Sequence, residues 1–251
     1  MGIRRGSIST PIIVDGLVFN VDAANRASYP RTGTTATDTI NYDVNTNNTG
    51  TFSNSNSSTF FSTDKGGIFL FDGIDDYITV NGSTNSGLNR PGITNQITLE
   101  SWCYTRTFNN NYERIIARRV GTTPLPYMFG FHTVSGNKYD LYLSGTNSYG
   151  PASLNSTTNV ILNEWVHFVG TSDNSTRKIY LNGVLDNSDS YSSGIFSTDI
   201  NLQIGAQSSG YNYNGDIGAV RIYDRALSAN EVLHNYNALK SRFEWVQEQV
   251  A

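Results

Sequence analysis

The chain has 251 residues and a formal net charge of −4, and charged residues make up only 15% of it. This length is enough for one large domain, or for two small ones, with a sizeable core. The weak acidic excess argues against nucleic acid as a partner, and no apolar run approaches the roughly 20 residues that span a membrane.

Neither the first residues nor the cysteine content indicates secretion. Residues 1–15 are expected to form an N-terminal arm, which contains two arginines but no apolar segment of signal-peptide length. The single cysteine, Cys103, excludes an internal disulfide and stands in an apolar run, where a free thiol packs as a small hydrophobic group. The sequence therefore predicts synthesis in the cytoplasm.

Short apolar runs separated by turn residues follow one another along most of the chain, which is rich in Gly, Asn, Ser and Thr. Residues 31–64 interrupt this pattern and are expected to form a surface excursion or one or two edge strands. Strands are expected at 16–22, 68–71, 77–80, 97–105, 114–120, 127–133, 138–144, 164–171, 177–181, 201–205 and 215–223. This succession predicts an all-β fold, a sandwich of two antiparallel sheets.

Two turns with glycine lie beside these runs. Asp72-Gly73 separates residues 68–71 from 77–80, and Asn182-Gly183 follows residues 177–181. Asp-Gly and Asn-Gly pairs favour the positive φ angles of tight hairpin turns. Both positions are therefore predicted to join paired strands.

One helix is expected, near the C-terminus. Ser228 and Glu231 have the spacing of a capping box, in which each side chain satisfies a backbone N–H of the first turn. An apolar stripe follows at Val232, Tyr236, Leu239, Phe243, Val246 and Val250. The stripe predicts a helix that runs nearly to the end, with residues 241–251 as an extension. Within it Phe243, Trp245 and Val246 are expected to dock on a partner, so that its deletion abolishes assembly and leaves the sandwich folded.

The sequence lacks the residue patterns of catalysis. A glycosidase needs two carboxylates that flank the scissile bond, whereas Glu100 and Glu164 stand singly and are interpreted as solvated strand residues. His167 lies among apolar residues of a strand and is interpreted as a structural imidazole. No serine or cysteine stands in a nucleophile elbow. A non-enzymatic protein is therefore predicted.

The best candidate for a ligand-contacting loop is the segment Tyr211, Asn212, Tyr213 and Asn214, which glycines flank on both sides. Tyrosine and asparagine together offer aromatic platforms and amide hydrogen bonds, which suit a sugar or an adaptable protein contact. The alternative is a hairpin loop without a ligand.

Five segments have a characteristic order: FDGIDDYI (71–78), ITLESW (97–102), NEWVHFV (163–169), KIYLNG (178–183) and GDIGAVRIYDRALS (215–228). Together they resemble the laminin-G-like jelly rolls of the concanavalin A-like lectin/glucanase superfamily. The resemblance covers residues 16–240 and implies one jelly-roll domain, an antiparallel two-sheet sandwich with a C-terminal helix. The opening at 16–25 and the ending at 235–240 resemble the variant found in tailed-bacteriophage virion proteins.

The resemblance also implies a structural calcium ion, because relatives hold one with an acidic side chain and backbone carbonyls. The matching positions are Asp22, the carbonyl of Gly67, and Asp216. The alternative is that these aspartates cap turns at the ends of strands.

For function, the resemblance implies a virion-associated structural or decoration protein that assembles with itself or with other virion proteins. The alternative is a lectin-like adhesion module that recognises host-surface glycans.

Overall fold

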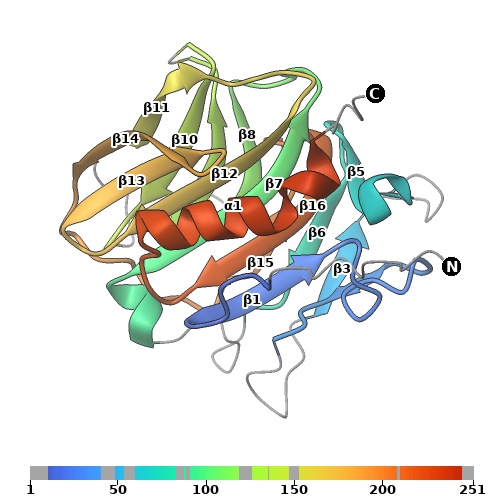
Figure 1. Ribbon diagram of the computed structural model, residues 1–251, viewed down its shortest axis with the longest axis horizontal. Coiled ribbons are helices and arrows are strands. Elements are labelled where there is room, and N and C mark those ends of the chain that lie inside the picture. Colours follow the sequence, from blue (N-terminus) through green and yellow to red (C-terminus); the bar gives the residue numbers. More distant parts are fainter. Residues whose placement is uncertain are drawn as a thin grey trace, which may run out of the picture.

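The computed structural model describes residues 11–40, 49–53, 60–82, 88, 91–118, 126–134, 136–146, 153–207 and 210–244. These residues form a sandwich of two antiparallel sheets with a single α-helix, α1 (Ala229–Phe243), across the outer face of one sheet (Figure 1). We call the sheet under the helix the front sheet and the other the back sheet. The predicted all-β jelly roll with a C-terminal helix is confirmed.

The front sheet has eight strands. They are β1 (Leu17–Asp22), β4 (Phe61–Ser62), β5 (Ile68–Asp72), β7 (Ile97–Thr105), β12 (Trp165–Ser172), β13 (Thr176–Leu181), β14 (Val184–Ser190) and β16 (Asn214–Tyr223). Their order is β14-β13-β12-β7-β16-β5-β4, and β1 pairs with the second half of β16. A 3-10 turn, η1 (Asp64–Gly66), precedes β5.

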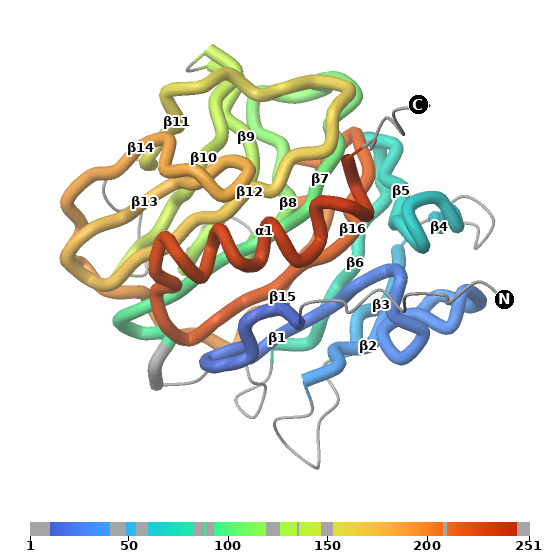
Figure 2. Tube along the Cα trace, in the orientation of Figure 1, coloured from blue at the N-terminus to red at the C-terminus, as the bar shows by residue number. Residues whose placement is uncertain are grey.

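The back sheet also has eight strands. They are β2 (Thr35–Thr37), β3 (Thr49–Ser53), β6 (Tyr77–Val80), β8 (Tyr112–Arg118), β9 (Tyr127–His132), β10 (Lys138–Leu143), β11 (Leu154–Asn159) and β15 (Leu202–Ile204). Their order is β11-β10-β9-β8-β15-β6-β3-β2, and a second 3-10 turn, η3 (Pro91–Thr94), precedes β7. The described parts of 31–64 thus supply β2 and β4, which end the two sheets (Figure 2), together with β3.

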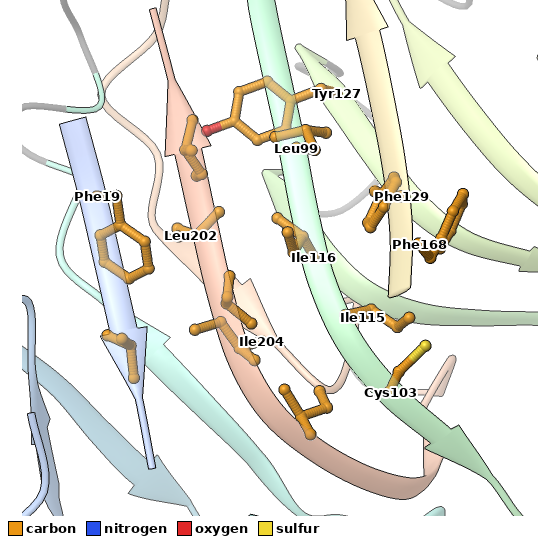
Figure 3. Packing of buried hydrophobic residues seen from close by; sticks show 14 of the residues in the cluster. Phe19, Leu99, Cys103, Ile115, Ile116, Tyr127, Phe129, Phe168, Leu202 and Ile204 are labelled. Carbon is orange, nitrogen blue, oxygen red and sulfur yellow. The ribbon is translucent and has the colours of Figure 1, made fainter. Parts of the chain in front are cut away.

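The core lies between the inner faces of the sheets (Figure 3). Because side chains alternate across a strand, every second residue of each central strand points inward. Phe129 and Phe168 face each other across the sandwich with ring centroids 3.8 Å apart. Cys103 is buried among them, as predicted, and burial raises the pKa of its thiol.

The two predicted turns have different outcomes. Asn182-Gly183 joins β13 to β14 in a hairpin with φ angles of 49° and 80°, as predicted. Asp72-Gly73 does not join paired strands, because β5 belongs to the front sheet and β6 to the back sheet. The side chain of Asp72 accepts a hydrogen bond from the Ile74 amide, at 2.8 Å, and the turn carries the chain from one sheet to the other. The prediction of a hairpin there is wrong.

Helix α1 begins with the predicted capping box. Ser228 accepts from the Glu231 amide, and the Glu231 carboxylate accepts from the Ser228 amide at 2.8 Å. The apolar stripe packs on the front sheet, where Phe243 stacks on Trp102 with ring centroids 4.5 Å apart. The described helix ends at Phe243.

No helix among the described residues is long and apolar enough to cross a membrane.

Beneath α1, a buried polar cluster joins the helix to the sheet. Glu100 is fully buried and accepts hydrogen bonds from Arg221, at 2.7 Å, and from Asn235 of the helix, also at 2.7 Å. His167 Nε2 lies 3.3 Å from the same carboxylate. Burial opposes ionisation of Glu100, but the adjacent Arg221 charge outweighs it and lowers the pKa to about 2. The interpretation of Glu100 as a solvated residue is therefore wrong, since its strand position faces the helix.

Candidate functional site

The three expected calcium ligands do not come together. Asp22 and the Gly67 carbonyl lie close to each other, but the guanidinium of Arg242 occupies the space between them. Asp216 lies elsewhere on the front sheet and forms an ion pair with Arg106. These residues therefore do not fit the calcium site that the resemblance implies.

An acidic cluster at the turn after β5 is the group of described residues that could best converge on a metal ion. Carboxylate oxygens of Asp72, Asp75 and Asp76 lie within 4.8 Å of one another. Two of them accept from backbone amides of the same turn: Asp72 from Ile74 and Asp76 from Asp72. Burial and the neighbouring acids raise the pKa of Asp76 to about 6. The hydrogen bonds indicate that the carboxylates of Asp72 and Asp76 stabilise the turn.

The segment predicted to contact a ligand is divided by the structure. Tyr211 is exposed and lies edge-on to Tyr112, with centroids 5.6 Å apart. Tyr213 is fully buried in the core, and Asn212 is buried and donates to the Ile74 carbonyl. Asn214 begins β16 and pairs with Asp72. Only Tyr211 of the two tyrosines is therefore available as an aromatic platform, because Tyr213, whose amide donates to the Gly205 carbonyl, has its ring in the core.

The predicted docking segment of the tail is also divided. Phe243 has 1% of its surface exposed and lies between Trp102 and Trp165. Its ring is thus part of the domain and is not free to contact a partner. Trp245 and Val246 lie outside the described residues.

A cleft that the sequence did not indicate lies beside the end of α1, on the outer face of the front sheet. Trp165 pairs with Tyr104, and Tyr104 pairs with Asp216, in neighbouring strands β12, β7 and β16. Directly opposed residues project from the same face of a sheet. The next residue along each strand is in the core, so this row faces outward. The two rings are half-buried with centroids 5.8 Å apart.

The end of α1 and the turn η1 build the walls of this cleft. Phe243 packs on Trp165 with centroids 4.7 Å apart, and both rings line the cleft. The cleft has a volume of about 920 Å³. We call it the Trp165 cleft and define it by its lining residues: Asp64, Lys65, Ile68, Tyr104, Arg106, Asn163, Glu164, Trp165, Asp216, Phe243 and Glu244.

Polar groups stand around the aromatic row. Arg106 follows β7 and donates to Asp216 and to the Phe71 carbonyl, yet 40% of its side chain is exposed. Burial raises the pKa of Asp216 to about 6, although the Arg106 charge opposes this shift. Asn163 and Glu164 are exposed at the start of β12. The cleft therefore combines an apolar surface with hydrogen-bonding groups of both kinds, as small-ligand sites do.

Sequence reasoning missed the cleft because its parts lie on separate strands. Tyr104 and Trp165 are 61 positions apart (165 − 104), and only the strand register makes them neighbours. The available signal was that Tyr104 lies near the end, and Trp165 near the start, of a predicted strand. The resemblance implies a calcium-ligating role for Asp216, whereas the structure places this residue in the cleft.

Two antiparallel eight-stranded sheets, a helix on one outer face and an open aromatic cleft beside it define a jelly-roll β-sandwich domain. A family model described as the concanavalin A-like lectin/glucanases superfamily matches residues 71–233, well over half of the chain. The protein belongs to this superfamily. A comparison with curated proteins by sequence gave no match.

Several solved structures have the same fold. Domain 4 of AbnA, an extracellular arabinanase from Geobacillus stearothermophilus solved with arabinotriose, superposes with a TM-score of 0.63 at 17% identity, over 88% of this chain and 98% of that one. The botulinum neurotoxin serotype G binding domain gives 0.64 at 18% identity, over 90% and 51%. A Trypanosoma rangeli sialidase gives 0.62 at 13% identity, over 92% and 35%. The chain thus spans about half of the toxin domain and a third of the sialidase.

Proposed function

We propose that this protein is a non-catalytic glycan-binding module and that the Trp165 cleft is its binding site. The observation that carries the proposal is the outward row of Trp165, Tyr104 and Asp216 on three adjacent strands. A sugar ring has an apolar C–H face, which packs on an aromatic ring, and a rim of hydroxyls that need hydrogen-bond partners. The row offers both within one cleft.

The charges in the cleft favour neutral sugars. Its lining contains four carboxylates (Asp64, Glu164, Asp216 and Glu244) and two cations (Lys65 and Arg106). A sialylated or uronate ligand would bring another negative charge into this acidic surrounding, which is unfavourable. The similar arabinanase domain was solved with arabinotriose, a neutral sugar, which supports the same ligand class.

Binding without hydrolysis is part of the proposal. A glycosidase places an acid and a second carboxylate on either side of the bond it cleaves. In the Trp165 cleft the most buried carboxylate, Asp216, is held by Arg106, and Glu100 lies beneath α1, away from the cleft surface. We therefore expect bound oligosaccharides to be released intact.

The experiment is a screen of neutral oligosaccharides, including arabinotriose, followed by titration calorimetry with the best ligand. Trp165→Ala and Tyr104→Ala should each weaken binding about fivefold or more, since stacking on one aromatic ring contributes about 1 kcal/mol or more. Tyr211→Ala is the matched control, because Tyr211 is an exposed tyrosine on the loop that the sequence favoured. Loss of binding in Tyr211→Ala alone would transfer the site to that loop, and absence of any neutral ligand would refute the proposal.

A second proposal is a structural or decoration role in a virion, with contacts to other virion proteins or to a second copy. It rests on the resemblance of residues 16–25 and 235–240 to bacteriophage virion proteins. One structural observation favours a protein contact: Val184 and Leu185 are 67% and 50% exposed, and Leu233 beside them is 42% exposed. Such adjoining apolar side chains are typical of a contact surface. The two roles are compatible, because this surface and the Trp165 cleft share no residue.

A further inference from the structure

The last turn of α1 carries an arginine that is surrounded by oxygen atoms. Arg242 Nη1 donates to both carboxylate oxygens of Asp22, at 2.7 and 3.0 Å. Its Nη2 donates to the Gly67 carbonyl at 2.6 Å and contacts the Gly218 carbonyl at 3.4 Å, and its Nε donates to the Lys65 carbonyl at 2.6 Å. A guanidinium has five N–H groups, so these contacts use all of its donors.

The oxygens come from three separate parts of the chain. Asp22 ends β1, Lys65 belongs to η1, Gly67 precedes β5, and Gly218 lies in β16. Figure 2 shows the end of β1, the turn before β5 and the end of α1 meeting at one place. Arg242 and Asp22 keep only 15% and 14% of their side-chain surface exposed. One cation therefore holds the beginning and the end of the domain together.

A carboxylate and several carbonyls are the hard oxygen ligands that calcium prefers. A calcium ion would need about six to eight such oxygens at roughly 2.3–2.6 Å, and the arginine side chain fills the space in which the ion would lie. Arg221 Nη2 lies a further 3.5 Å from the Asp22 carboxylate. Arg242 neutralises Asp22 and Glu100 neutralises Arg221, so a divalent cation would find no net negative charge here.

We propose that Arg242 takes the place of a bound cation where β1, η1 and α1 meet, and that the domain is held together there without calcium. The positive charge that relatives would obtain from the medium is thus part of the chain. This inference goes beyond glycan binding and does not depend on it.

The test compares thermal unfolding with calcium and with a chelator. The wild-type protein should have the same melting temperature in millimolar Ca²⁺ and in EGTA. Arg242→Ala removes the cation and leaves the oxygens facing a space, so its melting temperature should fall by about 10 °C in EGTA. Millimolar Ca²⁺ should restore part of this loss, and the double variant Arg242→Ala/Asp22→Asn should not respond, because it lacks the carboxylate.

Arg225→Ala is the matched control, since Arg225 also pairs with carboxylates, Glu231 and Asp15, and is similarly half-buried, but lies away from Asp22 and Gly67. It should be insensitive to Ca²⁺. A rise in the wild-type melting temperature with Ca²⁺ that titrates as one site and is lost in Asp22→Asn would overturn the proposal. An Arg242→Ala protein that is destabilised but unaffected by Ca²⁺ would also overturn the proposal. That result would mean that Arg242 contributes hydrogen bonds only and does not stand in for a cation. If Arg242→Ala does not fold, the same comparison is made with Arg242→Met, together with the Ca²⁺ titration of the wild-type melting temperature.

Discussion

The ring of Phe243 lies over the backbone of Gly218, so close that a Cβ at position 218 would stand 2.4 Å from two of the ring carbons. The ring cannot withdraw, because Trp102 and Trp165 hold it on its other sides. Gly218 therefore makes the space in which the last turn of α1 docks, and this docking in turn forms one wall of the Trp165 cleft.

Replacing this glycine should destabilise the domain. Gly218→Ala is expected to lower the free energy of unfolding by about 1–3 kcal/mol, the usual consequence of overpacking a fixed site. Urea denaturation measures the change. The double variant Gly218→Ala/Phe243→Leu should lose less stability than the sum of the losses in the two single variants, because the smaller side chain relieves the contact. Strict additivity would show that the two residues do not interact.

Truncation should show that residues 241–243 belong to the folded domain. A chain that ends at residue 240 loses Arg242 and Phe243, and removal of a buried phenylalanine side chain alone typically costs about 3–5 kcal/mol. We therefore expect a clear loss of stability in urea, in contrast to the sequence-based expectation that 241–251 is dispensable for folding. A chain that ends at residue 244 keeps both residues and is the matched control. Equal stability of the two truncated chains would contradict the assignment.

Much of the fold follows from local patterns. The strand positions, the Asn182-Gly183 hairpin and the capping box at Ser228 each depend on residues close together in sequence. The route of the chain between the sheets does not. Asp72-Gly73 has the composition of a hairpin turn, but β5 pairs with β4 and β16, and β6 pairs with β3 and β15. Pairing between distant strands decides the route, and no local signal reports it.

The site was harder to predict for the same reason. The cleft depends on the register that brings Trp165, Tyr104 and Asp216 into one row. The resemblance places Asp22 and Gly67 at one calcium site, and in the structure both contact Arg242. Arg242, however, lies in the segment predicted to be a partner-binding tail. A residue more than 200 positions from Asp22 fills the site (242 − 22), and the sequence gives no sign of this contact.

The stability of the domain should depend on pH in two opposite ways. Burial raises the pKa values of Asp76, Glu113 and Asp216 to about 6, above their values in the unfolded chain, so protonation of these groups favours the folded state. The pKa of Glu100 is lowered to about 2, so its contribution is present above its unfolded pKa and is lost as pH falls from about 4.5. Urea midpoints should therefore rise from pH 7 to about pH 5 and fall below that.

Glu100→Gln separates the two effects. The variant should be less stable at neutral pH, because Arg221 loses its buried partner. Its midpoint should also fall less steeply below pH 4.5 than that of the wild type. A wild-type midpoint that declines steadily from pH 7 downward would contradict the raised pKa values of the three other acids.

Glycan affinity should fall in mild acid if the Trp165 cleft is the site. Asp216, with a pKa of about 6, accepts hydrogen bonds fully only when it is ionised. A ligand whose hydroxyls donate to it should bind about tenfold more weakly at pH 5 than at pH 7, in proportion to the ionised fraction. Titration calorimetry across this range measures the change. Asp216→Asn should bind with an affinity that does not vary over the same range, and an unchanged pH dependence in that variant would assign the effect to another group.

Self-association, if the structural role holds, should depend on the apolar surface at the β13–β14 turn. A Cβ on Gly183 would lie 3.0 Å from the side chain of Leu233, which places the helix beside the exposed Val184 and Leu185. Val184→Ser/Leu185→Ser should shift the mass measured by multi-angle light scattering toward the monomer and leave glycan binding unchanged. Val134→Ser is the matched control, because Val134 is 64% exposed on the turn between β9 and β10. A wild-type protein that stays monomeric at every concentration would exclude self-association through this surface.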